Sequence, residues 1–310
     1  MKRLMIASIL SLILVGLVTS TVFAADKFVL GFSPKALVSP FWIRMTEAVK
    51  EYGAANDIEV LIVAPPAETD VMQQMNMLED LIQQGVDLIA VGPTDPQGLV
   101  PTLQGAIDAG IPVVIMETQT PLPGVDAVSV IGSDNVTAGR MVGEYTAKLL
   151  DGKGNVVVIE GIAGNNTGEE RKQGFNEIMD QYDDLNVVAS QPGNWERALA
   201  MNVMENILQS NPEVDFVFAC SDEMGLGALM ALEASDMQVP VIGVDGNKDA
   251  VIAIQEGRME ASVAQSPEKM GELLITEVVE KLRDGQDVEP ILTTEFFMIT
   301  KDNADQFLQD

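Results

Sequence analysis

Two apolar stretches of the sequence predict the fold: Gly110-Ile111-Pro112-Val113-Val114-Ile115 and Gln238-Val239-Pro240-Val241-Ile242-Gly243. Each is an apolar run entered through a proline, a residue that is tolerated at the first position of a strand. Neither run alternates with polar residues, which is typical of parallel strands covered by helices on both faces. The spacing from Pro112 to Pro240 also relates Val86-Asp87-Leu88-Ile89 to Val214-Asp215-Phe216-Val217. We therefore expect two similar halves, because this spacing is far longer than the period of a solenoid repeat.

The chain around these stretches alternates short apolar runs with helical patterns. In the first half we expect strands at residues 28–32, 58–63, 86–91 and 112–116, and helices at 41–53, 69–84 and 97–109. Thr69 is a candidate N-cap of the second helix, and Gly85 is its candidate C′ residue. This order predicts an α/β fold of two doubly wound parallel sheets.

Composition excludes several classes of function. The length of 310 residues favours two domains, and a formal net charge of −29 repels nucleic acids and anionic lipids. The sequence has no histidine, and Cys220 is its one cysteine, which we expect in the core. Ser-His-Asp catalysis, histidine-ligated zinc and disulfides are therefore ruled out. No metal or cofactor is expected.

The stretch from Met1 to Ala24 has the pattern of a signal peptide. The basic Met1-Lys2-Arg3 precedes an apolar run from Leu4 to Val18, and Val22-Phe23-Ala24 has the spacing of a cleavage site. The apolar run is shorter than the roughly 20 residues of a membrane-spanning helix. We expect cleavage after Ala24 and release into the periplasm.

Two carboxylates are predicted to face a common cleft. Ligands of open α/β sheets bind beyond the carboxyl ends of the strands. Glu117 and Asp245 follow the two proline-led strands at equivalent positions, with the same spacing as the prolines. Ionised carboxylates accept hydrogen bonds from neighbouring hydroxyls. The alternative is that both are solvated loop acids in an acidic chain.

Two tryptophans and two cations fall at the same end of the strands. Trp42 and Trp195 could stack on the apolar faces of a sugar ring, or they could belong to the core. Arg171 follows a Gly-rich loop that lacks the Gly-Lys-Ser/Thr of a phosphate cradle, and it could donate to ligand hydroxyls or pair with a surface acid. Lys35 is a further candidate ligand contact or a solvated loop residue.

A series of motifs along the chain resembles one family. In order they are Ser39-Pro40-Phe41-Trp42, Gly132-Ser133-Asp134-Asn135-Val136, Gly161-Ile162-Ala163-Gly164, Glu170-Arg171 with Gly174-Phe175, Asn202-Val203-Met204, Ser221-Asp222-Glu223-Met224 with Gly227-Ala228-Leu229, Val244-Asp245-Gly246 and Ala264-Gln265. Over residues 26–300 the chain resembles a ribose-type periplasmic sugar-binding protein of an ABC importer, with the type I periplasmic binding protein fold.

The resemblance implies two lobes joined by three chain crossings near residues 132, 265 and 294. The implied N-terminal lobe comprises residues 25–132 and 266–293, and the C-terminal lobe comprises 133–265 and 294–310. It implies a monomer that closes on a small sugar or polyol by hinge bending. The closed form would then deliver the ligand to an inner-membrane permease and its ATPase.

The resemblance also carries over binding positions. Phe41, Trp42 and Trp195 match the aromatic residues of ribose binders, and Arg171, Asp245 and Gln265 match their polar residues. Together with Lys35 and the residues that differ from ribose binders, the predicted site is Ser33, Lys35, Ser39, Phe41, Trp42, Glu117, Thr118, Arg171, Trp195, Ser221, Asp245 and Gln265.

Several of these positions depart from the ribose-binder pattern. Glu117-Thr118 replaces Asp-Arg, Ser39 and Ser221 replace Asn, and Trp195 replaces Phe. The loop Ser33-Pro34-Lys35 is more similar to relatives that bind deoxysugars or quorum-signal autoinducers. These departures disfavour ribose itself, because a lost Arg fork removes charge-assisted hydrogen bonds.

Four other functions were weighed against sugar import: a glycosidase, a ligand sensor, an autoinducer-binding protein and a sugar-responsive repressor. A glycosidase could use Glu117 and Asp245 as its carboxylate pair, but we do not expect an enzyme. A sensor that docks to a chemoreceptor or histidine kinase is compatible with the same binding role, and so is binding of an autoinducer. A sugar-responsive repressor would need an N-terminal DNA-binding segment in place of the signal peptide.

Overall fold

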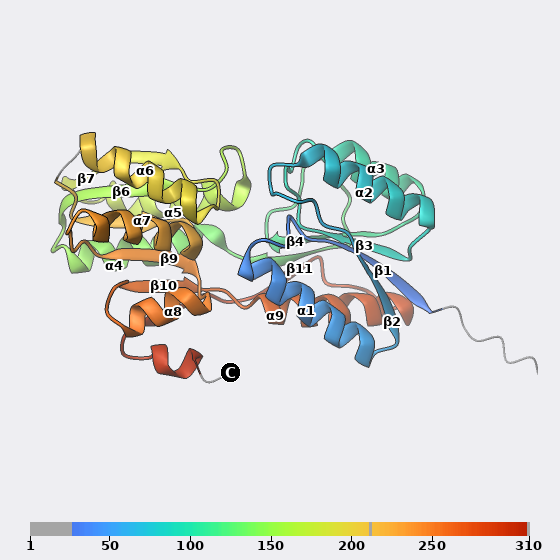
Figure 1. The fold of residues 1–310 in the computed structure, drawn as a ribbon. Helices are drawn as coiled ribbons and strands as arrows, with labels where there is room; N and C mark the ends of the chain where they lie inside the picture. Colours follow the sequence, from blue (N-terminus) through green and yellow to red (C-terminus); the bar gives the residue numbers. More distant parts are fainter. Residues whose placement is uncertain (1–26, 211–212, 309–310) are drawn as a thin grey trace, which may run out of the picture.

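The computed structural model describes residues 27–210 and 213–308. The predicted signal peptide and its cleavage site after Ala24 lie outside these residues. The described chain forms two lobes that lie side by side (Figure 1). Each lobe is built on one six-stranded sheet, and the strand order corresponds in the two sheets.

The N-terminal lobe contains the sheet β11-β5-β4-β3-β1-β2. Its strands are all parallel to their neighbours. They are β1 (Phe28–Ser33), β2 (Ile58–Ile62), β3 (Leu88–Val91), β4 (Val113–Thr118), β5 (Ser129–Ser133) and β11 (Ile291–Thr293). Its helices are α1 (Pro40–Ala55), α2 (Val71–Gln84), α3 (Val100–Asp108), α9 (Pro267–Leu273), the π-helical turn η1 (Leu274–Val279) and α10 (Glu280–Arg283).

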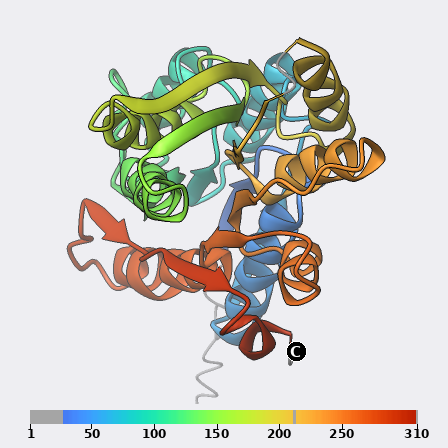
Figure 2. The same cartoon turned by 90° about the vertical axis from the view of Figure 1, so that its left-hand side faces the viewer.

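The C-terminal lobe contains the sheet β12-β10-β9-β8-β6-β7, in which β12 alone pairs antiparallel among the described strands. The strands are β6 (Lys153–Glu160), β7 (Asp184–Pro192), β8 (Phe216–Ala219), β9 (Val241–Asp245), β10 (Ala261–Ala264) and β12 (Phe297–Thr300). The helices are α4 (Asn135–Leu149), α5 (Asn166–Met179), α6 (Arg197–Ser210), α7 (Asp222–Ala234), α8 (Lys248–Gln255) and the 3-10 turn η2 (Ala304–Phe307). Figure 2 turns this lobe toward the viewer.

The prediction of two similar doubly wound halves is confirmed. β3 and β8 begin at Leu88 and Phe216, and β4 and β9 begin at Val113 and Val241, so both pairs of strands keep the spacing seen in the sequence. Helices of each lobe pack in corresponding groups, α1 with α9 and α2 with α3 in one lobe, and α4 with α5 and α6 with α7 in the other.

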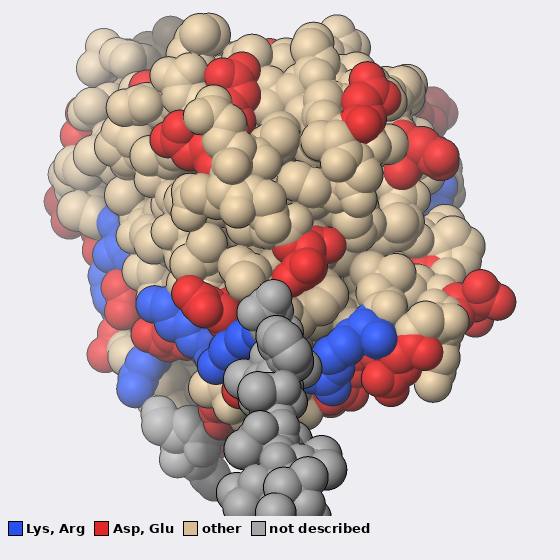
Figure 3. Space-filling model, turned by 90° about the vertical axis from the view of Figure 1, so that its right-hand side faces the viewer, with Lys and Arg blue, Asp and Glu red and all other residues tan. Residues whose placement is uncertain are grey.

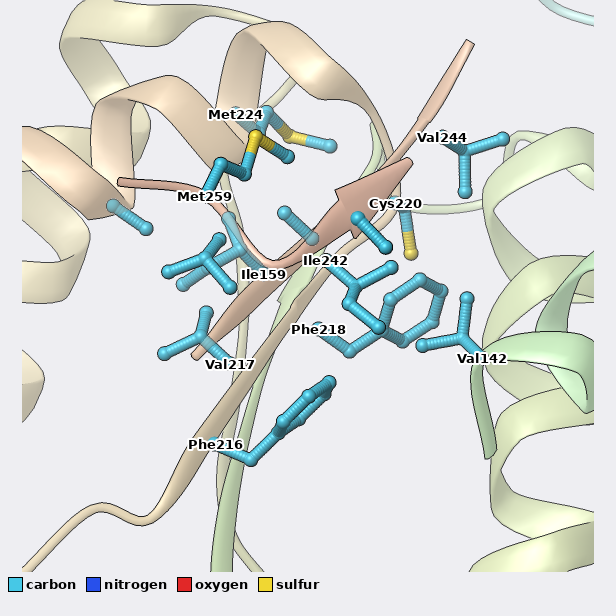
Figure 4. Packing of buried hydrophobic residues seen from close by; sticks show 14 of the residues in the cluster. Val142, Ile159, Phe216, Val217, Phe218, Cys220, Met224, Ile242, Val244 and Met259 are labelled. Carbon is cyan, nitrogen blue, oxygen red and sulfur yellow. The ribbon is translucent and has the colours of Figure 1, made fainter. Parts of the chain in front are cut away.

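Each sheet is apolar on both faces. Along β3, Leu88 and Ala90 pack in the cluster that contains α1 and α9, whereas Ile89 and Val91 pack in the cluster that contains α2 and α3. Successive strand residues point to opposite faces, so an unbroken apolar run is what this position requires. Figure 4 shows the corresponding core of the C-terminal lobe, with the buried Cys220 at the end of β8 as expected.

The chain passes between the two sheets three times within the described residues. It leaves the first sheet after β5, returns after β10 and leaves again after β11. β5 runs to Ser133, one residue beyond the expected crossing. There the Ser133 and Thr294 hydroxyls lie 2.8 Å apart, which ties two of the crossings together.

Two helix starts differ from the prediction. α2 begins at Val71 with Asp70 as N-cap, so Thr69 as N-cap was wrong, whereas Gly85 at φ 68° ends the helix as expected. α3 begins at Val100 because Asp95 Oδ1 accepts hydrogen bonds from the amides of Gln97 and Gly98 in a separate turn.

Acidic side chains are spread over the exposed face of the N-terminal lobe, with a few Lys and Arg near its lower edge in that view (Figure 3). This agrees with the formal charge of −29. Within residues 27–210 and 213–308, none of the helices has the length and apolarity that a membrane crossing requires.

Candidate ligand-binding site

A cavity lies where the carboxyl ends of the strands of the two lobes meet. The space within it, including the part that is open to solvent, is about 360 Å³. Its lining residues are Lys35, Ser39, Phe41, Trp42, Glu68, Glu117, Arg171, Trp195, Ser221, Glu223 and Asp245. Nine of the twelve predicted site residues are therefore brought together around one small space.

Glu117 and Lys35 form a buried ion pair on the N-terminal lobe. Glu117 lies at the end of β4 with φ 74°, and the ammonium of Lys35 donates to its Oε2. Their side chains are only 9% and 4% exposed. Two charges this deeply buried must be paired, because each alone would lose its hydration without compensation.

Arg171 and Asp245 form the corresponding pair on the C-terminal lobe. Arg171 Nη1 lies 3.6 Å from Asp245 Oδ1. Its Nε donates to Asn135 Oδ1 at 2.9 Å, and its Nη1 donates to the Cys220 carbonyl at 2.6 Å. These contacts fix the guanidinium, yet Nη2 is buried without a hydrogen-bond partner in the described structure. A buried donor without a partner is costly, so Nη2 is available to a ligand oxygen.

Asp245 has an unusual backbone and an unusual carboxyl. Its φ is 134°, a conformation that side-chain-bearing residues rarely adopt. Burial raises the pKa of its carboxyl to about 6, and the Arg171 guanidinium acts against that shift. Gln265 Nε2 donates to Asp245 Oδ1 at 2.9 Å, which leaves Oδ2 free to accept from a ligand.

The aromatic walls come from both lobes. Phe41 and Trp42 meet edge to face at the start of α1, with their ring centroids 5.3 Å apart. Trp195 faces them from the loop after β7, and its buried Nε1 has no partner among the described residues. The interpretation of Trp42 as a core residue is also borne out, since it is only 2% exposed and packs with α1 and α9.

Glycines make room for both tryptophans. A Cβ on Gly92, just after β3, would lie 2.2 Å from the Trp42 ring. A Cβ on Gly161, just after β6, would lie 2.1 Å from the Trp195 ring. Real Cβ atoms do not approach other atoms so closely, so only glycine at these two positions permits the observed ring positions.

The lobes touch each other across the cavity. Thr167 Oγ1 of α5 donates to Glu117 Oε2 at 3.4 Å. Outside the cavity, Thr120 Oγ1 donates to Glu170 Oε1 at 2.6 Å, and Arg44 Nη1 donates to the Gly246 carbonyl at 3.4 Å. The structure is therefore of the closed arrangement, in which residues of both lobes line one cavity.

Three predicted site residues do not line the cavity. Ser33 is fully buried and its hydroxyl accepts from Gln74 Nε2 at 3.1 Å. Thr118 Oγ1 accepts from the Thr120 amide at 2.9 Å. Gln265 lies behind Asp245, which it orients. The side chains of all three are hydrogen-bonded within the described chain and are absent from the cavity lining.

Two lining residues were missing from the predicted site. Glu68 lies in the loop between β2 and α2, and burial raises its pKa to about 7 while Lys35 opposes the shift. Its position past the carboxyl end of a strand was the signal that could have found it. Glu223 lies in the first turn of α7 and receives hydrogen bonds from Arg197 Nε and Nη2, both at 2.9 Å.

The chemistry of the cavity is that of reversible polar binding. Its walls offer carboxylate acceptors, an unpartnered guanidinium nitrogen and indole N–H, and aromatic faces. The described part of the chain holds no group of three or more Asp, Glu, Cys or His side chains placed to bind a metal ion. A compact ligand with many hydroxyls matches this set of donors and acceptors.

Comparisons with known proteins agree with this chemistry. The family model of the periplasmic binding protein domain matches residues 30–287. The ribose import binding protein of Bacillus subtilis is 36% identical over 86% of this chain and 85% of its own. The xylitol-binding protein of Mycolicibacterium smegmatis is 34% identical over 86% of this chain and 76% of its own.

Solved structures show the same likeness. An ABC transporter solute-binding protein of Bacillus halodurans with bound myo-inositol is 33% identical, with a TM-score of 0.83 over 91% of this chain and 97% of its own. One from Actinobacillus succinogenes with bound D-allose is 29% identical, with a TM-score of 0.84 over 90% of this chain and 100% of its own. The chain therefore belongs to the periplasmic binding proteins, and among them to the ribose-type sugar-binding proteins.

Proposed function

We propose that the protein captures one small sugar or polyol between its lobes and presents it to the inner-membrane permease of an ABC importer. The observation that carries this proposal is the buried, unpartnered Nη2 of Arg171 in a cavity walled by aromatic rings of both lobes. Relatives named for ribose and xylitol, and similar structures with bound D-allose and myo-inositol, support the same class of ligand.

The nine lining residues that the sequence predicted are the proposed ligand contacts, together with Glu68 and Glu223. Trp42, Phe41 and Trp195 would cover the apolar C–H faces of the ligand. Asp245 would accept from ligand hydroxyls, and Arg171 would donate to a ligand oxygen. Ser33, Thr118 and Gln265 would act as positioning residues behind them.

Binding would be coupled to closure of the two lobes. The proposed lobes are residues 25–132 with 266–293 and residues 133–265 with 294–310, and the three crossings between them would act as the hinge. The ligand would stabilise the closed form because both lobes touch it only in that form. The closed form is then the one a permease would recognise.

The proposal includes export and a role without catalysis. The mature chain would begin after Ala24 and act as a monomer. Both carboxylates of the alternative glycosidase pair are held in ion pairs, Glu117 with Lys35 and Asp245 with Arg171.

Native mass spectrometry of the protein purified from the periplasm of an expression host tests the proposal. We expect one small hydroxylated ligand per chain, either carried through purification or added from a panel of sugars and polyols. Added glycosides should be recovered intact after incubation. Failure of every sugar and polyol to bind the folded chain, or release of a hydrolysed product, would contradict the proposal. Binding of a chemoreceptor domain by the closed form would add a sensing role.

A further inference from the structure

The charged side chains that line the cavity are paired, with one exception among the described residues. Lys35 pairs with Glu117, and Arg171 lies 3.6 Å from Asp245. Glu223 lies 2.9 Å from Arg197, which stands outside the cavity lining. The remaining ionisable side chain is that of Glu68, which forms no salt bridge with any other described residue.

Glu68 makes no hydrogen bond or ion pair with the rest of the described chain. It lines the cavity and also the two grooves that open beside it between the lobes. The first groove is bordered by Val38 and Trp195, and the second by Thr94 and Asn165. Glu68 therefore stands where the cavity meets its mouth, with its carboxylate free for a ligand.

The groups that face Glu68 do not supply a partner for it. They are the cations Lys35 and Arg171 and the anions Glu117 and Asp245, which compensate one another. Asp222 lies behind Asp245 and accepts from Ser262 Oγ and the Asn247 amide, so it adds no positive charge. Burial raises the pKa of Glu68 to about 7, and a bound cation would hold its carboxyl ionised.

The C-terminal lobe shows what the rest of the ligand must offer. Arg171 is 1% exposed and its Nη2 has no partner, and Trp195 Nε1 is also buried without one in the described structure. Both are donors, so they require oxygen acceptors on the ligand. A ligand that satisfies both lobes combines oxygen acceptors for these two donors with a donor group for the Glu68 carboxyl.

We propose that the ligand is a sugar or polyol that carries one basic amino group, and that its ammonium binds the Glu68 carboxylate. This inference rests on the proposed function and names its ligand class more closely. An ammonium carries three N–H donors and the missing positive charge, and its hydrogen bonds to a carboxylate are charge-assisted. A hydroxyl at the same position would donate one hydrogen bond but would bring no positive charge to the carboxyl.

Calorimetric titration with matched pairs tests the inference. The pairs are D-glucosamine with D-glucose, D-galactosamine with D-galactose, and 1-amino-1-deoxyribitol with ribitol, each at pH 7.0. In at least one pair we expect the amino member to bind at least tenfold more tightly than its hydroxyl parent. Glu68→Gln, which keeps the shape of the side chain, should reduce that preference to less than threefold.

Glu79→Gln serves as the matched control, because it removes the same charge from an exposed position of α2 in the same lobe. It should keep the full preference, and thermal unfolding should show that both variants are folded. If a hydroxyl parent binds as tightly as its amino partner wherever binding is seen, or if Glu68→Gln keeps the preference, the inference is overturned and the proposed function stands. If no member of any pair and no other sugar or polyol binds, both are contradicted.

Discussion

Glu117 and Asp245 occupy equivalent ends of β4 and β9, one in each lobe, and both have positive φ angles of 74° and 134°. Each is buried, and each is paired with a cation of its own lobe. Residues held in such rarely populated conformations cost about 1–3 kcal/mol each and cluster at functional sites. The equivalent positions and positive φ angles of Glu117 and Asp245 therefore indicate that the cavity is the functional site of both lobes.

Replacing Asp245 with Asn should weaken ligand binding at least tenfold, or about 1.4 kcal/mol. The amide keeps the size of the side chain but removes the charge that faces Arg171 and that accepts from ligand hydroxyls. Isothermal titration calorimetry with the best-binding sugar or polyol measures the loss. Asp180→Asn, at an exposed position of the same lobe, should leave the affinity within twofold. Equal affinities of the wild type and Asp245→Asn would remove Asp245 from the site.

Replacing Gly92 or Gly161 with alanine should reduce the affinity for the ligand at least tenfold, although neither residue is a proposed ligand contact. The added methyl group would overlap Trp42 or Trp195 and displace the ring that walls the cavity. Titration with ligand, followed by tryptophan fluorescence, reports both the environment of the indole rings and the affinity for the ligand. Gly105→Ala is the control, because a Cβ there meets nothing within 4 Å. Unchanged affinity in both cavity variants would show that the rings do not hold the ligand.

The parts of the fold that could be predicted from the sequence are those that rest on unbroken apolar runs. Such runs form β3 and β4 and their counterparts β8 and β9, with one spacing between the two halves. The ends of these strands therefore predicted where the cleft lies. β11 has three residues and no pattern of its own. It pairs with β5 only because the chain returns to the N-terminal lobe after it has formed most of the C-terminal lobe.

The composition of the site was predictable only in part. Strand ends place Glu117 in the cleft, but the neighbouring Thr118 lines only a smaller pocket beside Pro93 and Leu122, which Glu117 also borders. The Thr118 hydroxyl accepts from the Thr120 amide instead of lining the cavity. Glu68 lies in an irregular loop, and periodicity says nothing about where such a side chain points. Its position past the carboxyl end of β2 could have suggested the cleft, but only the folded loop shows that it lines the cavity.

Removing the hydrogen bond between Thr120 and Glu170 should favour the open arrangement. Thr120→Val keeps the shape of the side chain but loses a bond that joins the lobes at an exposed position. We expect the affinity to fall about two- to threefold, because exposed hydrogen bonds contribute about 0.5 kcal/mol. Small-angle X-ray scattering of the ligand-free variant should give a larger radius of gyration.

A double-mutant cycle provides the control for this bond. Combining Thr120→Val with Glu170→Gln should cost no more affinity than the more damaging single change, since both remove the same bond. Fully additive losses would mean that the two residues act separately.

The stability of the ligand-free protein should depend on pH through Asp222. Burial, with a further contribution from Asp245, raises the pKa of Asp222 to about 7. Between pH values of about 4 and 7 the folded state then holds a proton that the unfolded state has released, so the free energy of unfolding falls as pH rises. The contribution approaches about 1.4 kcal/mol per pH unit.

Asp222→Asn isolates this effect. Its stability relative to the wild type, measured by urea denaturation, should rise from pH 4.5 to pH 7.0 and then level off. A constant difference across that window would mean that Asp222 titrates normally in the folded protein.

The most direct test of ligand capture between the lobes is a thermal-shift screen against sugars, polyols and their amino derivatives. A ligand at 100 times its Kd stabilises the folded state by about 2.7 kcal/mol. For a chain of this size that corresponds to a rise of several degrees in Tm. We predict such a rise for at least one compound with the wild type and its loss with Asp245→Asn. A folded wild-type protein whose Tm no member of the panel raises would contradict the account.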